Sequence, residues 1–148
     1  MSSELREEFF TSIIHFRRLE SALCTECEMQ MNEMVILQSI AGTCCRECPC
    51  MNLDVPQMQK KLRISKPAIS YILNTLEKKK YITREIDPKD RRKVSISATP
   101  EGKAAAEESK KKYDEMWSEL LDRFGEENMR QLIRLINELD SLSSGFSE

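Results

Sequence analysis

The 148-residue sequence lacks the features that mark several common classes of protein. No apolar run approaches the roughly 18 residues that a membrane-spanning helix needs. Segment 1–8 is acidic and amphipathic rather than basic and then apolar, so we expect no signal peptide and a cytoplasmic protein. His15 is the sole histidine, and no Ser–His–Asp set, phosphate-binding loop or paired-carboxylate motif is visible, which argues against hydrolase and kinase chemistry.

An excess of positive charge is also absent from the chain as a whole, whose formal net charge is −2. The basic side chains are concentrated between residues 60 and 93, where 12 bases and four acids leave a local charge of +8. The remainder of the chain is acidic. A basic centre between acidic segments is typical of a DNA-contacting module held between other helices, and a solvated charged face is the alternative.

Two short helices joined by a tight turn are predicted in this basic segment. Asp54 can cap the first helix and Ser65 the second, and each helix has a proline in its first turn. The second helix should extend to about Lys80. It carries a one-sided apolar stripe that leaves the opposite face polar, formed by Ile69, Ile72, Leu73 and Leu76. This pattern predicts a helix-turn-helix.

A β-hairpin is predicted immediately afterwards. Residues 81–86 and 94–98 show the period-two alternation of half-buried strands. The segment between them, 87–93, is polar and turn-forming. The hairpin would be a wing on the helix-turn-helix, and together they would occupy residues 54–98.

Further helices are predicted on both sides of this module. Residues 3–23 and 29–41 form two helices before it, and Gly42 can end the second. Residues 100–142 follow it, with Thr99 as a cap and a break at Gly125. We therefore expect one domain, 1–148, that is mainly α with a small β-hairpin wing: a winged helix-turn-helix with flanking helices.

Side chains for DNA contact are expected at two places. In helix-turn-helix proteins the N-terminal part of the second helix meets base edges, and there Asn74 could reach an adenine. Arginines at a hairpin tip suit the narrow minor groove, and Asp90 is expected to orient a neighbouring guanidinium; an ordinary charged turn is the alternative. The predicted DNA-binding residues are Ser65, Lys66, Ala68, Ser70, Tyr71, Asn74, Asp90, Arg91, Arg92 and Lys93.

Four segments of this sequence together resemble the MarR family of bacterial transcription regulators. They are Ser-Lys-Pro-Ala-Ile-Ser at 65–70, Leu-Glu-Lys-Lys-Lys-Tyr-Ile at 76–82, Asp-Pro-Lys-Asp-Arg-Arg at 87–92 and Ala-Thr-Pro-Glu-Gly at 98–102. The family's most specific mark is an Asp-x-Arg wing followed by a Leu-Thr-x-x-Gly helix start. This chain has Ala98 in place of the usual Leu and Lys80 in place of a frequent Gly.

The resemblance implies a homodimer in which the helices at 3–23 and 100–142 interlock, and their long apolar seams agree with such a role. A two-fold dimer predicts a pseudo-palindromic duplex site with half-sites about one helical turn apart. The resemblance also implies repression that is relieved by an effector, which would be a small molecule, an oxidant or a soft metal. DNA binding of this kind requires no cofactor.

Six cysteines fall into two groups, Cys24 and Cys27 before the second helix, and Cys44, Cys45, Cys48 and Cys50 after it. In a reducing compartment such groups indicate soft-metal binding, for example zinc, or thiol redox chemistry rather than structural disulfides. One zinc site joining both groups is disfavoured, because a helix about 20 Å long separates them. A local site within 44–50, a bridge between subunits and a thiol switch stay open, as do buried or incidental thiols.

Two other functions stay open from the sequence. A thiol oxidoreductase could use Cys24 and Cys27, although the alternating strand–helix pattern that usually carries such a motif is absent. A helical interaction protein that never touches DNA is the other alternative. The salt dependence of DNA binding distinguishes them, because binding to phosphates weakens steeply as salt rises.

Overall fold

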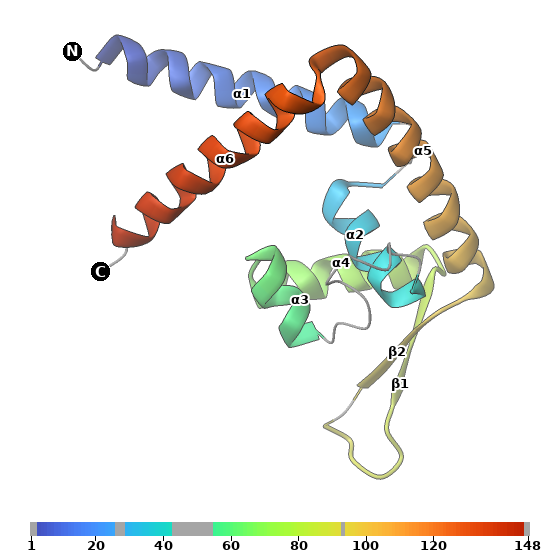
Figure 1. Cartoon of the computed structure of the whole chain (residues 1–148). Coiled ribbons are helices and arrows are strands. Elements are labelled where there is room, and N and C mark those ends of the chain that lie inside the picture. Colours follow the sequence, from blue (N-terminus) through green and yellow to red (C-terminus); the bar gives the residue numbers. More distant parts are fainter. Residues whose placement is uncertain (1–2, 26–28, 43–54, 93, 147–148) are drawn as a thin grey trace. The chain divides into compact units, whose positions relative to one another are not determined.

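A computed structural model describes residues 3–25, 29–42, 55–92 and 94–146. The chain divides into two compact units, Met1–Lys112 and Tyr113–Glu148. The first unit contains α1 (Ser3–Thr25), α2 (Met31–Ala41), α3 (Val55–Leu62), α4 (Lys66–Lys78), β1 (Ile82–Ile86), β2 (Val94–Ala98) and the start of α5 (Pro100–Phe124) (Figure 1). The second contains the rest of α5, α6 (Glu126–Ser143) and a short 3₁₀ helix, Ser144–Phe146. The predicted fold class, mainly helical with a β-hairpin, is confirmed.

The core of the first unit is built around α4. All four residues of its predicted apolar stripe are buried. They pack with Ile36 and Leu37 of α2, Met58 of α3, Ile82 of β1 and Ala106 of α5. Burying one such aliphatic side chain contributes about 1.5–3 kcal/mol. The helix-turn-helix and the hairpin are therefore held by one shared core.

Helix ends agree with the predicted signals in most places. Gly42 ends α2 in the left-handed region, with φ of 68°. Ser65 caps α4, where its side chain accepts a hydrogen bond from the Ala68 backbone N–H at 3.3 Å. The expected cap at Asp54 lies outside the described residues. Helix α2 begins at Met31 rather than Met29, although Met29 is buried in the core.

The end of α4 differs from the prediction, because the helix stops at Lys78 and not at Lys80. Lys80 adopts φ of 62°, its N–H donates to the Glu77 carbonyl, and the Tyr81 N–H donates to the Leu76 carbonyl. These two bonds form a Schellman motif, in which the left-handed position is usually glycine. The lysine occupies a conformation that disfavours a side chain by about 1–2 kcal/mol.

The hairpin is a two-stranded antiparallel sheet with Ile82 opposite Ala98, Arg84 opposite Ile96 and Ile86 opposite Val94. Strand β1 begins at Ile82, one residue later than predicted, because the Tyr81 N–H belongs to the α4 terminus. The Tyr81 carbonyl accepts from the Thr99 N–H at 3.0 Å. The two ends of the hairpin are thus joined where α4 ends and α5 begins.

Gly102 lies against this joint. Thr99 Oγ1 accepts from the Gly102 N–H at 3.0 Å and donates to the Lys80 carbonyl at 2.7 Å. A Cβ on Gly102 would lie 1.9 Å from the Tyr81 carbonyl oxygen. Only glycine allows the first turn of α5 to approach the hairpin entrance this closely.

The second unit is a helical pair with a break at Gly125, whose φ is 91°. Tyr113 and Trp117 stack within α5 with ring centroids 6.3 Å apart. Helix α6 has exposed apolar side chains at Ile133, Leu135, Ile136, Leu139 and Leu142. Among the described residues, no helix combines the length and the apolar character of a membrane span.

We expect Gly102→Ala to lower the free energy of unfolding by at least about 2 kcal/mol, because the added methyl group meets backbone and not a side chain that can move. Gly145→Ala is the matched control, since nothing lies within 4 Å of its Cβ position. Urea denaturation of both variants measures the difference. Equal stability of the two variants would show that the close approach at Gly102 is wrong.

Candidate nucleic-acid interface

The outward face of α4 carries most of the predicted contact residues. Ser70, Tyr71 and Asn74 are exposed, and Tyr71 is 69% exposed despite its aromatic ring. Lys66 is exposed at the helix start, and Ala68 is half-buried beside Ile69. The Ser65 hydroxyl already accepts from the helix backbone, which leaves its own proton to donate. A polar helix face opposite a buried stripe is thereby presented to solvent.

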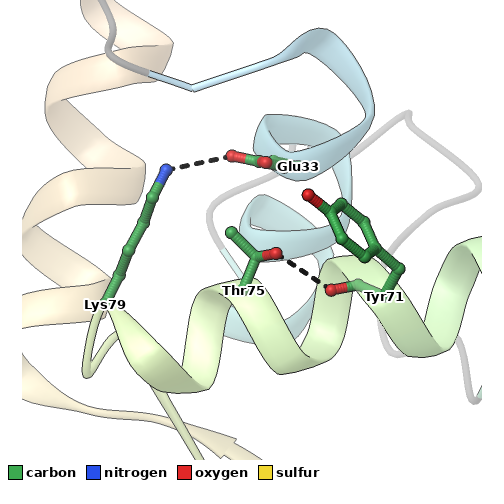
Figure 2. Close-up of polar contacts among 4 residues, drawn as sticks. All are labelled: Glu33, Tyr71, Thr75 and Lys79. Carbon is green, nitrogen blue, oxygen red and sulfur yellow. Dashed lines mark hydrogen bonds and ion pairs between the residues drawn. The ribbon is translucent and has the colours of Figure 1, made fainter.

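An ion pair fixes α4 against α2. Lys79 Nζ lies 3.1 Å from Glu33 Oε2, and the Glu33 residue is only 6% exposed (Figure 2). Figure 2 also shows Tyr71, Thr75 and Lys79 in succession along one side of α4, where the Thr75 hydroxyl donates to the Tyr71 carbonyl at 3.0 Å. Since a buried carboxylate needs a compensating cation, this pair ties the end of α4 to the neighbouring helix.

A second polar network joins α4 to the hairpin. Arg84 of β1 donates from Nη2 to Asn74 Oδ1, and its Nε lies 2.7 Å from Glu77 Oε2. The Asn74 carboxamide therefore already has a partner within the protein. Bidentate contact with adenine uses both the amide oxygen and the amide nitrogen, and here Arg84 takes one of the two lone pairs of that oxygen.

The wing tip is organised by two aspartates. Asp87 Oδ1 accepts from the Lys89 N–H at 2.7 Å and from the Asp90 N–H at 3.2 Å. Asp90 Oδ1 accepts from the Arg92 backbone N–H at 3.0 Å. Asp90 was expected to hold a guanidinium, so its observed partner is a correction: the carboxylate shapes the turn through the backbone, as aspartate commonly does.

Arg91 and Arg92 are exposed on this tip. Because the aspartate carboxylates engage backbone N–H groups, the two guanidinium groups extend from a turn of defined shape. Lys93, the remaining predicted wing contact, lies outside the described residues.

The cysteine predictions fall almost entirely outside the described residues. This holds for Cys27, Cys44, Cys45, Cys48 and Cys50, and of Cys24 only the backbone position at the end of α1 is described. Within the described ranges, no group of three or more His, Cys, Asp or Glu side chains is arranged to hold a metal ion. The metal and redox interpretations of the cysteines therefore remain predictions.

Sequence reasoning missed three residues of this surface, Glu33, Lys79 and Arg84, although each had a signal. Glu33 is the only acid in the apolar helix Met31–Ala41. Arg84 lies between Ile82 and Ile86 on the face of β1 that alternation predicts to be inward. A charged side chain on an apolar face indicates a buried or bridging partner.

Helices α3 and α4 with the hairpin define a winged helix-turn-helix protein. The model of the MarR family matches residues 30–94 of this chain. The uncharacterized HTH-type transcriptional regulator YdgJ of Bacillus subtilis is 32% identical over 79 residues, 53% of this chain and 48% of that protein. The HTH-type transcriptional repressor YetL of the same organism is 24% identical over 96 residues, 65% of this chain and 58% of its own. The matches thus span about half the length of these relatives.

Solved structures share the fold across nearly the whole chain. The S. aureus MepR–DNA complex aligns with a TM-score of 0.68 at 23% identity, covering 91% of this chain and 96% of that one. A MarR/EmrR family regulator from Acinetobacter sp. ADP1 gives a TM-score of 0.66 at 23% identity, with 95% and 96% covered. NadR in complex with 4-hydroxyphenylacetate gives 0.62 at 20% identity, with 97% and 99% covered. At these identities the likeness establishes the fold.

We expect Lys79→Met to lower the free energy of unfolding by about 1–3 kcal/mol, because it leaves the buried Glu33 carboxylate without its cation. Adding Glu33→Leu should recover most of this loss, since both charges are then gone. Urea denaturation of the two single variants and the double variant measures the coupling.

Arg123→Met is the control, because its ion pair with Glu119 is largely exposed and should contribute less than about 1 kcal/mol. If the loss of unfolding free energy in the double variant equals the sum of the losses in the two single variants, Glu33 and Lys79 do not interact and the buried pair is contradicted.

Proposed function

We propose that this chain is a transcription regulator that binds duplex DNA, with α4 in the major groove and the wing in the adjacent minor groove. The observation that supports it best is the exposed polar face of α4, borne on the same core as a hairpin that presents two arginines. The 13 residues of α4 make a helix about 20 Å long. Its diameter with side chains, about 10–12 Å, fits a major groove about 12 Å wide.

The candidate contacts divide by chemistry. Ser65 and Lys66 at the helix start suit phosphate, where unpaired backbone N–H groups and the helix dipole also favour an anion. Ser70, Tyr71 and Asn74 lie further along the exposed face and are placed for base edges. Arg91 and Arg92 suit the negative potential of a narrow minor groove. The local charge of +8 over residues 60–93 would attract the duplex as a whole.

A homodimer is part of this proposal. Helix α1 exposes Leu5, Phe9, Phe10, Ile13, Ile14 and Phe16, each between 44% and 68% exposed. The apolar residues of α6 are similarly uncovered. Exposed apolar faces of this extent mark surfaces that a protein partner covers, and a second copy of the chain accounts for both. Two copies would place two recognition helices on a pseudo-palindromic site.

The proposal also includes the direction of regulation and the classes of effector that could control it. The relative YetL is named a repressor, and NadR was solved with a small aromatic acid bound. We propose repression by this chain, relieved by a small molecule, an oxidant or a soft metal. The six cysteines are the residues through which an oxidant or a metal would act.

The test begins with selection of bound duplexes from a random pool, followed by affinity measurements across a range of salt concentrations. We expect the affinity for DNA to fall steeply as the salt concentration rises. Arg92→Ala should weaken binding about ten-fold or more, and it should reduce the slope of log affinity against log salt concentration by about one per subunit. Arg134→Ala is the control: Arg134 is an exposed arginine of α6, outside the proposed interface.

A selected pool with no enriched sequence, or an affinity insensitive to salt, would contradict DNA binding and favour a helical interaction protein. Equal effects of the Arg92 and Arg134 variants would remove the wing from the interface.

A further inference from the structure

We propose that Arg84 sets the base preference of Asn74, by holding the carboxamide oxygen toward the hairpin and leaving the amide hydrogens as the groups that meet DNA. This inference rests on the proposed DNA-binding function and adds a specificity rule to it. Asn74 contacts the DNA, whereas Arg84 acts through Asn74 as a positioning residue.

The geometry fixes the orientation of the carboxamide. The guanidinium of Arg84 has donors and no acceptor, so the Asn74 atom that faces it must be the oxygen. Helix α4 and strand β1 are adjacent in the core through Leu76 and Ile82, and Arg84 follows Ile82 on the same face of the strand. Arg84 therefore reaches α4 from the hairpin without leaving its strand position.

Glu77 holds the other side of the guanidinium. Its Oε2 lies 2.7 Å from Arg84 Nε, and the Arg84 side chain is 26% exposed. Within the part of the chain that the structure describes, Arg84 Nε makes no hydrogen bond, so Glu77 acts as an ion-pair partner whose charge favours the arginine where it lies over a turn toward a DNA phosphate. Asn74 and Glu77 are three residues apart on α4, so one arginine can bridge them.

The consequence follows from the donor and acceptor pattern of the major groove. An unconstrained asparagine reads adenine with its oxygen on N6 and its amide nitrogen on N7. Arg84 uses one of the two lone pairs of the oxygen and holds that oxygen toward the hairpin, so the amide hydrogens are the groups that Asn74 offers most readily to a base. Guanine presents two neighbouring acceptors, O6 and N7, whereas adenine and thymine present one each, N7 and O4, and cytosine presents only a donor. We therefore expect guanine first at the position that Asn74 contacts.

The experiment compares base preferences in duplexes selected from a random pool by four full-length proteins: the unmodified chain, Arg84→Met, Asn74→Ala and the double variant. Arg84→Met keeps the aliphatic stem and removes the donors. It should shift one position per half-site from guanine toward adenine by about ten-fold, with other positions unchanged. Asn74→Ala should abolish the preference at that same position whether or not Arg84 is present.

Arg91→Met is the matched control, an arginine of the same hairpin that lies at its exposed tip. It should weaken binding without moving any base preference. Adenine preferred by the unmodified chain at the Asn74 position, or an unchanged preference in a folded, DNA-binding Arg84→Met protein, would overturn the inference. Failure of the unmodified chain to select any duplex would instead overturn the proposed function.

Asn74→Asp provides an independent arm if Arg84→Met proves unstable. It keeps an oxygen for Arg84 and replaces the amide donors by an acceptor, so the preference should move from guanine to bases that present a donor, cytosine or adenine. A guanine preference that survives Asn74→Asp would overturn the inference.

Discussion

The close approach of Gly102 to the Tyr81 carbonyl is the constraint on which the winged module depends. Four chain segments meet there: the end of α4, the two ends of the hairpin and the first turn of α5. The Tyr81 N–H donates to the Leu76 carbonyl of α4, and the Thr99 N–H donates to the Tyr81 carbonyl across the hairpin entrance. Thr99 closes the joint through its hydroxyl, which donates to the Lys80 carbonyl and accepts from the Gly102 N–H. A hairpin that leaves a helix through such a joint cannot pivot freely, so the wing keeps a defined position beside α4.

The polar contacts around α4 follow from that fixed position. Because the hairpin is anchored at Tyr81, Arg84 lies two residues into β1, within reach of Asn74 and Glu77 on α4. On another side, Lys79 reaches Glu33 of α2 just before the chain turns at Lys80. Such pairs add modest stability, since desolvation offsets much of the charge attraction. Their larger effect is to fix the helix and one of its exposed side chains, Asn74, in a single orientation.

Periodicity and capping signals predicted the helices and strands to within about two residues, because these features are local. The ends of α4 show the limit. Ser65 and Pro67 marked the start correctly, whereas the three lysines suggested a helix to Lys80 and concealed the left-handed residue that ends it. The candidate site was predicted as a set of DNA-contacting residues; the structure leaves Ser70, Tyr71, Asn74, Arg91 and Arg92 exposed, and their contact with DNA stays a prediction. What could not be predicted were partners distant in sequence, such as Glu33 for Lys79 and Arg84 for Asn74, because they depend on how the elements pack.

The central claim is that one rigid module presents α4 and the wing to adjacent grooves of the same duplex. Dimethyl sulfate tests it directly on a selected site, because the reagent methylates guanine N7 in the major groove and adenine N3 in the minor groove. The account predicts protection of guanine N7 where α4 lies, flanked within the same half-site by protection of adenine N3 where Arg91 and Arg92 lie. Protection confined to one groove on DNA that is fully bound would contradict it.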